Sequence, residues 1–219
     1  MIIAMDAPPP YQLWRVALTS MPPVDEIRLL SSDERAAAAR LVFERDRRRY
    51  LTSHLALRRA LESCVAIASA DLCFTVGPAG KPALARPPSC HFSLSRSADI
   101  AVISVAESVP IGVDVELQRV VPDALALAAR NFTPAECEEL GSLEGPERDV
   151  AFLRCWTRKE ACLKAIGCGL SIEPRLVEVG QTPDRRRARI PTATGPVQVV
   201  VESLAATGNL VVSIARVAG

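Results

Sequence analysis

The chain has 219 residues, of which 49% are apolar, and its 26 basic and 25 acidic side chains leave a net charge of +1. This balance argues against a nucleic-acid-binding protein, which usually carries a strong basic excess, and no apolar run approaches the roughly 18 residues that a membrane helix needs. The length suits one large domain or two of about 100 residues each, with enough apolar side chains for a sizeable core.

The first half of the chain is predicted to mix helices with short strands. Alternating or continuous apolar residues predict strands over 11–18, 72–76, 91–95 and 100–106. One helix is predicted to start at Ser31-Ser32-Asp33-Glu34, where acidic residues occupy the first turn. A longer helix is predicted over 46–68 from the helical spacing of its apolar residues.

Val109-Pro110 interrupts the chain near its midpoint, and the second half continues the mixture. Strands are predicted over 111–117, 197–201 and 210–214. Thr133-Pro134-Ala135-Glu136 is typical of a helix start, and a long helix is predicted over 147–166, ending at Gly167. Because each half is predicted to run from helices to strands, the order is consistent with two similar α+β halves, although the sequence shows no convincing residue-level repeat.

The cysteines and the N-terminal residues indicate the cellular compartment in which the protein is expected. The first ten residues lack the basic segment and the following apolar segment of a secretory signal, so we expect a cytoplasmic protein. Seven cysteines, mostly in apolar surroundings and without a C-x-x-C pair, predict buried reduced thiols. His54 and His91 are the only histidines and neither has ligand spacing to a cysteine pair, so no zinc site is expected.

Two acidic residues stand in the predicted strand over 111–117. Strand alternation puts Asp114 and Glu116 on one face, about 7 Å apart, with Val113 and Val115 facing the core on the other side. Two neighbouring carboxylates repel each other unless a cation lies between them, and hard oxygen ligands suit Mg²⁺ or Mn²⁺. The alternative is an acidic strand edge that faces solvent.

A second cluster lies on the predicted long helix. Its apolar stripe is formed by Phe152, Trp156 and Leu163. Lys159 projects into the middle of this stripe, and Glu160 and Lys164 follow its edge on one face. A charge within a core stripe is costly unless it is paired. Either the lysine stem snorkels to solvent, or this face lines a cleft that holds a polyanion, where Glu160 could complete a metal site.

Two polar turns and a basic run complete the candidate residues. Lysine lies between glycine and proline at Gly80-Lys81-Pro82, which is a common turn. In F-S-L-S-R-S, residues 92–97, the apolar residues are expected to face inward and Ser93 and Ser95 outward. The end of this segment, Ser95-Arg96-Ser97, would then either bind a phosphate through its hydroxyl groups and guanidinium or form an ordinary polar turn. The run Arg185 to Arg189 is expected to be a solvated hairpin, or alternatively a surface that docks an acidic carrier protein.

Lysine itself is rare in this chain. There are 23 arginines and three lysines, namely Lys81, Lys159 and Lys164. Where composition favours arginine so strongly, a retained lysine indicates a position that the wider, planar guanidinium does not suit.

In their fixed order, G-K-P-x-L, F-S-L-S-R-S, G-V-D-V-E and W-T-R-K-E-A-x-x-K-A-x-G-x-G-L resemble the 4′-phosphopantetheinyl transferase family. The resemblance covers roughly residues 35–175, and the last two motifs are highly specific in combination. The W/KEA wording is similar to the surfactin-type branch, which serves secondary-metabolite synthases such as polyketide synthases and nonribosomal peptide synthetases.

The resemblance implies a pseudo-dimer of two similar α+β halves, each with helices packed on a small, mostly antiparallel sheet, and with coenzyme A bound between them. Residues 1–108 would form the coenzyme A adenine and phosphate side, and residues 109–219 the metal site and catalytic helix. The implied reaction is Mg²⁺-dependent transfer of 4′-phosphopantetheine from coenzyme A to a serine of an apo acyl or peptidyl carrier protein, releasing adenosine 3′,5′-bisphosphate. We expect a monomer.

The resemblance also implies a role for each matched residue. The implied metal ligands, for Mg²⁺ or alternatively Mn²⁺, are Asp114, Glu116 and Glu160. Glu160 would take the serine proton, directly or through a metal-bound water, while Lys164 would stabilise charge on the pyrophosphate. The implied coenzyme A contacts are Arg49, Lys81, Pro82, Ser95, Arg96, Lys159 and Lys164.

The chain departs from the family pattern in one motif. The family's usual asparagine and histidine are replaced by Ser93 and Arg96. Arg96 keeps a hydrogen-bond donor and adds a permanent charge, whereas Ser93 removes an amide. Two alternatives stay open at this point: a coenzyme A or carrier-protein binding module without catalytic activity, and an unrelated magnesium-dependent nucleotide enzyme.

Overall fold

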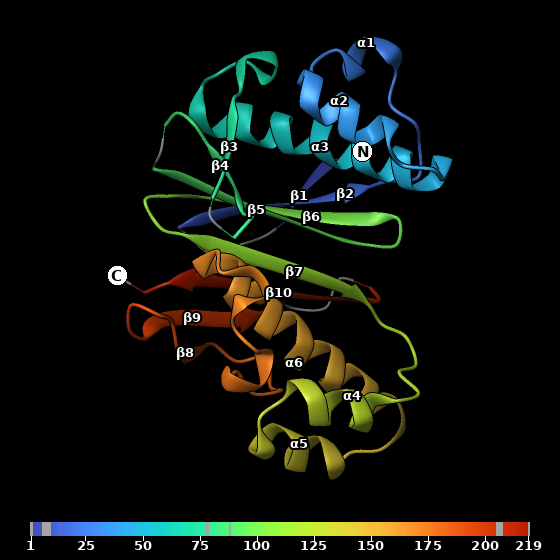
Figure 1. Ribbon diagram of the computed structural model, residues 1–219. Helices are drawn as coiled ribbons and strands as arrows, with labels where there is room; N and C mark the ends of the chain where they lie inside the picture. Colours follow the sequence, from blue (N-terminus) through green and yellow to red (C-terminus); the bar gives the residue numbers. More distant parts are fainter. Residues whose placement is uncertain (1, 6–9, 78, 88, 205–207, 219) are drawn as a thin grey trace. The chain divides into compact units, whose positions relative to one another are not determined.

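The computed structural model describes residues 2–5, 10–77, 79–87, 89–204 and 208–218 (Figure 1). Its contacts divide the chain into two compact units. Unit 1 comprises Met1–Thr75 and Pro82–Ser108, and unit 2 comprises Val76–Lys81 and Val109–Gly219. No helix in the described part of the chain is long and apolar enough to cross a membrane.

Unit 1 has a four-stranded antiparallel sheet and three helices. Its sheet has the order β1-β2-β6-β5, made of β1 (Ile2–Met5), β2 (Tyr11–Ala17), β6 (Ile100–Glu107) and β5 (Cys90–Ser97). The helices are α1 (Val24–Ile27), α2 (Ser32–Ala39) and α3 (Glu44–Val65). The short strands β3 (Phe74–Val76) and β4 (Pro82–Leu84) pair as a separate two-stranded sheet. Leu57 and Leu61 of α3 share one core with Phe92 and Ile103 of the large sheet.

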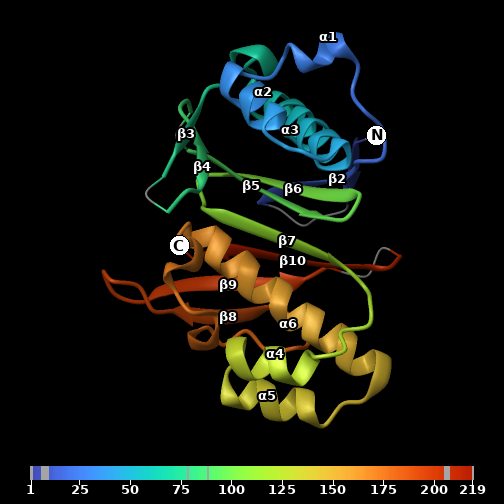
Figure 2. The same ribbon diagram turned by 45° about the vertical axis from the view of Figure 1, so that its right-hand side comes forward.

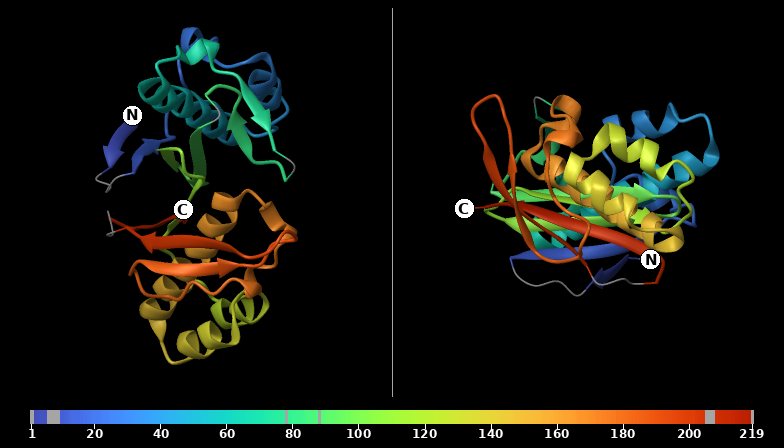
Figure 3. Two further views of the ribbon diagram at one scale, coloured as in Figure 1. Left: turned by 90° about the vertical axis from the view of Figure 1, so that its left-hand side faces the viewer. Right: turned by 90° about the horizontal axis from the view of Figure 1, so that it is seen from below.

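Unit 2 has a second four-stranded antiparallel sheet, in the order β7-β10-β9-β8. Its strands are β7 (Ile111–Leu117), β8 (Arg186–Ile190), β9 (Val197–Ser203) and β10 (Leu210–Val217). The helices are α4 (Ala124–Asn131), α5 (Pro134–Gly141) and α6 (Gly145–Ile166). The long helix α6 lies across β7, β10 and β9, as Figure 2 and the left view of Figure 3 show. Leu153 and Leu163 of α6 share its core with Val201 and Val211.

The expected fold class is confirmed, since each unit combines helices with a small antiparallel sheet. Each unit begins with strands, so the expectation of helices first was wrong. The long helix of unit 1 ends at Val65 and not at residue 68, because Ala66 adopts a left-handed conformation with φ of 54°. The helix starts at Ser31 and Thr133 are confirmed as capping boxes with Glu34 and Glu136.

The structure also shows how buried the cysteines are and where the basic run lies. All seven cysteines are free thiols, and three of them are buried, whereas Cys73 is exposed. The run Arg185 to Arg189 lies in and before β8, which pairs with β9 as a hairpin. Its arginines are exposed while Ala188 and Ile190 face the core, which confirms the solvated hairpin.

Candidate active site

The site in unit 2 depends on close packing between β7 and α6. A Cβ atom added to Gly112 would collide with the main chain of α6 at Ala161 and Ala165, so only glycine allows the helix to approach the strand this closely. Asp114 and Glu116 lie on the same face of β7 as Gly112, because side chains alternate along a strand. The two carboxylates are therefore carried on the face that meets α6.

Asp114 is the best buried of the predicted metal ligands. Its side chain pairs with Lys164, with 2.7 Å between Oδ1 and Nζ, and the residue is only 6% exposed. The solvent-facing acidic edge is therefore wrong for Asp114. Lys164 also lies 3.4 Å from the carbonyl oxygen of Val113 and occupies the last turn of α6, where the helix dipole favours a positive charge.

Glu160 lies one turn before Lys164 on the same helix. Burial raises the pKa of Glu160, and the negative charges of Asp114 and Glu116 raise it further, while Lys164 opposes them. Glu160 thus interacts electrostatically with both acidic residues of β7. Glu116 is less buried and pairs with Arg119 at 3.0 Å.

The carboxylates suit a metal ion in their chemistry. Among the residues that the structure describes, no group of three His, Cys, Asp or Glu stands close enough together to be a ready metal site. The donor set nevertheless suits a hard divalent cation in its chemistry, since all three side chains are carboxylates and, besides burial, the charges of Asp114 and Glu116 raise the pKa of Glu160. A cation among these carboxylates would relieve their mutual repulsion.

Lys81 belongs to unit 2 and binds main-chain oxygen atoms there. Its Nζ donates to the carbonyl of Ile111 at 2.9 Å and to that of Ala165 at 3.1 Å. Burial lowers the pKa of Lys81 to about 8. The lysine thus connects its turn to the first residue of β7 and the end of α6, while its contact with coenzyme A stays a prediction, as does that of exposed Pro82.

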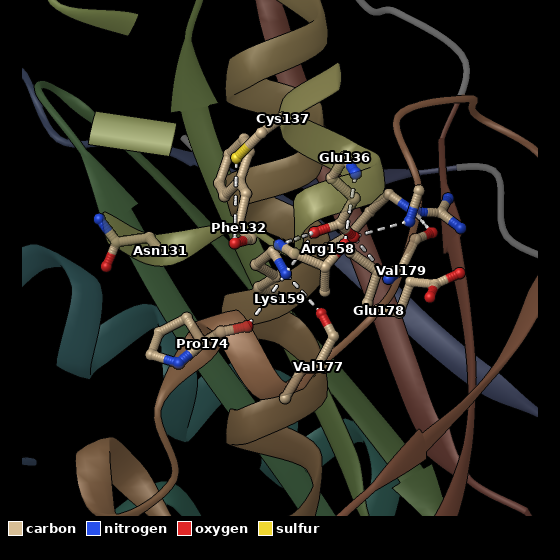
Figure 4. Close-up of polar contacts among 12 residues, drawn as sticks. Asn131, Phe132, Glu136, Cys137, Arg158, Lys159, Pro174, Val177, Glu178 and Val179 are labelled. Carbon is tan, nitrogen blue, oxygen red and sulfur yellow. Dashed lines mark hydrogen bonds and ion pairs between the residues drawn. The ribbon is translucent and has the colours of Figure 1, made fainter. Parts of the chain in front are cut away.

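Lys159 has a different place from the one predicted. Figure 4 shows its ammonium pointing to three oxygen acceptors inside unit 2. It pairs with Glu136 at 2.7 Å and donates to the carbonyls of Pro174, at 3.0 Å, and Val177. The side chain is fully buried, so snorkelling was wrong. Because all three ammonium donors have protein acceptors, the predicted coenzyme A contact of Lys159 is corrected to an internal role.

Unit 1 holds the remaining predicted residues. Ser93 and Ser95 were expected to face outward, but both are buried. The exposed Arg96 lies with its guanidinium 5.7 Å from the Tyr50 ring centroid and its Nη1 3.4 Å from Ser53. In the described residues Arg96 makes no ion pair with a carboxylate.

Arg49 differs from Arg96 in its charge environment. Its Nε lies 2.9 Å from Asp99, and its Nη1 lies 3.6 Å from Asp46. Arg48 binds the same Asp99 oxygen at 2.9 Å. A phosphate would compete with these carboxylates for Arg49, whereas Arg96 carries a charge without an acidic partner in the described part of the chain.

Sequence reasoning missed two residues that shape the site. Gly112 was quoted only as part of a motif, although a glycine between buried apolar residues of a strand signals close backbone approach. Glu136 was recognised as a helix cap, but nothing in its sequence neighbourhood indicates that it also pairs with Lys159.

Comparison with known proteins defines the class of enzyme. A family model described as "4'-phosphopantetheinyl transferase, N-terminal" matches residues 20–108, and one described as "4'-phosphopantetheinyl transferase superfamily" matches residues 110–215. The two models divide the chain close to the boundary between its units. Both describe transferases.

Individual relatives agree with the family models. The chain is 41% identical over 145 residues to a putative 4′-phosphopantetheinyl transferase of Synechocystis, covering 65% of this chain and 59% of the relative. It is 33% identical to the 4′-phosphopantetheinyl transferase psf-1 of Bacillus pumilus, over 80% of this chain and 74% of the relative. It is 35% identical to the 4′-phosphopantetheinyl transferase HetI of Nostoc, over 78% and 74%. The chain therefore belongs to the 4′-phosphopantetheinyl transferase superfamily.

Proposed function

We propose that the protein transfers 4′-phosphopantetheine from coenzyme A to a serine of an apo acyl or peptidyl carrier protein and releases adenosine 3′,5′-bisphosphate. The observation that carries this proposal is the cluster of Asp114, Glu160 and Lys164 between β7 and α6. It combines acidic ligands for a cation with a lysine that can bind phosphate oxygen atoms. Family membership of both units supports the same reaction.

The metal site of the proposal consists of Asp114, Glu116 and Glu160, with Mg²⁺ as the ion and Mn²⁺ as a substitute. When bound, the ion would supply positive charge that stabilises the negative charge developing on the 5′-phosphate of the leaving group as the pyrophosphate of coenzyme A is cleaved. Lys164, which lies 2.7 Å from Asp114, is proposed to add a second positive charge at the same phosphate.

Glu160 is proposed as the base. The serine oxygen of the carrier attacks the phosphorus on the pantetheine side, the bond to the bisphosphate oxygen breaks, and the serine proton passes to Glu160. Burial is the largest cause of the raised pKa of Glu160, and a carboxylate with a raised pKa is better matched to proton transfer near neutral pH than an ordinary one. The proton moves directly or through a water molecule.

The coenzyme A contacts in unit 1 are proposed to include Arg96, Ser95 and Arg49, with Arg96 on the 3′-phosphate. Its unpaired positive charge in the described residues supports this choice. Lys81 and Pro82 are proposed to contact the adenine end. Membership of the surfactin-type branch, a carrier from secondary-metabolite synthesis, a monomeric state and a cytoplasmic location belong to the same proposal.

One experiment tests the reaction. The protein is incubated with coenzyme A labelled in its pantetheine arm, Mg²⁺ and an apo carrier protein, and a parallel reaction uses Glu160→Gln. Label on the carrier with the native protein and not with the variant supports the transferase. Binding of coenzyme A without transfer would indicate a binding module, and absence of binding would contradict the proposal altogether.

A further inference from the structure

The two long helices of the protein carry a buried cation at the same position. α3 and α6 both have 22 residues, and each ends at a residue with a left-handed conformation, Ala66 and Gly167. Arg58 lies 14 residues after Glu44, the first residue of α3, and Lys159 lies 14 residues after Gly145, the first residue of α6. Both side chains are almost completely inaccessible to solvent.

Each buried cation pairs with the capping-box glutamate of the preceding short helix. Arg58 binds Glu34, which caps α2, at 2.6 Å, and Lys159 binds Glu136, which caps α5, at 2.7 Å. Buried charges of this kind are retained only when they are paired and hydrogen-bonded. The matched pairs therefore form a residue-level repeat that sequence comparison of the halves did not reveal, because arginine stands in one and lysine in the other.

Each cation also binds the segment that follows its long helix. Arg58 donates to the carbonyls of Ser69, at 2.5 Å, and Leu72, at 3.1 Å. Lys159 donates to those of Pro174 and Val177, as Figure 4 shows. In both units the ion pair thus connects the short helix, the long helix and the following segment.

The residue after the cation distinguishes the two units. In α3 it is Arg59, which pairs with Glu26 near the surface, whereas in α6 it is Glu160, the proposed base and metal ligand. Glu136 accepts two further hydrogen bonds, from the main-chain N–H groups of Val179 at 2.8 Å and Gly180 at 3.1 Å. The Lys159 ammonium therefore has three acceptors, of which Glu136 is itself held by the main chain of the segment that follows α6.

We propose that the Glu136–Lys159 ion pair is a positioning device for Glu160. It fixes the rotation of α6 about its axis at the residue next to Glu160, and so directs the Glu160 carboxylate toward Asp114 and Lys164. A misplacement of about 1 Å in a catalytic group costs roughly a hundredfold in rate. This inference rests on the proposed function, in which Glu160 binds the metal ion and accepts the serine proton.

The test compares the two units. Lys159→Met and Glu136→Gln break the pair in unit 2, and Arg58→Met breaks the matched pair in unit 1, where the residue after the cation is Arg59 and not a carboxylate. Mn²⁺ affinity is measured by the paramagnetic resonance signal of free Mn²⁺ with coenzyme A present, together with kcat, the KM for the carrier protein, and the thermal midpoint. All assays run at a temperature at which every variant compared is folded.

We expect the unit 2 variants to lose Mn²⁺ affinity and turnover, and the unit 1 variant to lose only thermal stability. Lys159→Met should weaken Mn²⁺ binding by roughly tenfold to a hundredfold and lower kcat while the carrier KM stays the same, because loss of a supporting residue misorients a ligand. Arg58→Met should lower the thermal midpoint but leave Mn²⁺ affinity and kcat close to native. If Lys159→Met does not fold, Glu136→Gln, which keeps the side-chain shape, carries the same expectation.

A further variant separates this inference from the proposed function. If Glu160→Gln keeps native Mn²⁺ affinity and turnover, the proposed metal site is wrong. If Glu160→Gln loses both while folded Lys159→Met or Glu136→Gln keeps both, the positioning role is overturned and the proposed function stands. Equal losses of Mn²⁺ affinity in Lys159→Met and Arg58→Met would also overturn it, since the effect would then be general destabilisation.

Discussion

Replacing Lys164 by arginine tests whether the site needs a compact ammonium group and not merely a positive charge. Lys164 Nζ lies 2.7 Å from Asp114 Oδ1 and 3.4 Å from the Val113 carbonyl, so one donor atom serves both groups. A planar guanidinium spreads its donors over a wider fork and cannot occupy the same point. A shift of about 1 Å in the charge beside the pyrophosphate should lower kcat by roughly a hundredfold.

The stability of the Lys164→Arg variant should change little. The Lys164 side chain is 32% exposed, and ion pairs with a solvated partner contribute only about 0.2–1 kcal/mol. The assay is kcat for transfer to an apo carrier protein, with the thermal midpoint measured on the same preparation. Arg186→Lys, on the exposed face of β8, is the control for arginine–lysine exchange and should behave as the native protein does. Native kcat in Lys164→Arg would refute the reasoning.

Three other predictions address the remaining parts of the site and fold. Asp114→Asn should lower turnover by about a hundredfold or more while the protein stays folded, and full activity with Mg²⁺ would contradict its role as a ligand. Native protein should bind coenzyme A roughly tenfold to a hundredfold better than dephospho-coenzyme A by calorimetry, and this preference should shrink in Arg96→Ala; an unchanged preference would place the 3′-phosphate elsewhere. Burial raises the pKa of Glu34, but hydrogen bonds from His54, Arg58 and Ser31 outweigh it and lower this pKa from 4.5 to about 2. The ionised Glu34 therefore stabilises the fold above pH 4.5, and this stabilisation is lost as the pH falls toward 2. Urea unfolding across that range should show a smaller pH dependence in Glu34→Gln, and an equal dependence would contradict the assignment.

The sequence predicted best the elements whose pattern is local. The strand β7 has the predicted bounds, Ile111–Leu117, because its residues alternate regularly, and α6 ends at Gly167 as expected because glycine adopts the left-handed conformation there. β8 was missed because exposed arginines hide the alternation of Ala188 and Ile190. The edge strand β1 and the short helix α4 have no comparable pattern, and pairing with β2 or packing against neighbouring helices determines them.

The role of Lys159 could be predicted only in part. A charged side chain in an apolar stripe must either be paired or extend to solvent, and this much follows from the helix sequence alone. The partner itself lies on another helix, 23 residues earlier, where the sequence shows a helix cap. Main-chain carbonyls supply the other acceptors, and no residue type identifies these in advance. The distinction between a ligand-binding lysine and an internal one therefore depends on tertiary contacts.

The preference for lysine or arginine at the two matched positions can be tested by exchange between the units. All three lysines donate to main-chain carbonyls within unit 2, yet Arg58 performs the task of Lys159 in unit 1. Both cations lie beside an aromatic ring, since the Lys159 ammonium is 5.4 Å from the Phe132 ring centroid and the Arg58 guanidinium is 5.0 Å from the Phe74 ring centroid. The Lys159 side chain is fully buried, and its ammonium contacts three oxygen acceptors.

A guanidinium at position 159 is larger than the ammonium that these three acceptors contact in a fully buried place, and overpacking typically costs about 1–3 kcal/mol. Lys159→Arg should therefore lower the free energy of unfolding in urea by that amount. Arg58→Lys should lose one of the arginine's hydrogen bonds to Glu34, Ser69 or Leu72, at a cost of about 0.5–3 kcal/mol, without any strain. If Lys159→Arg has the same free energy of unfolding as the native protein, lysine is not required at this position. Its presence there would then reflect composition alone.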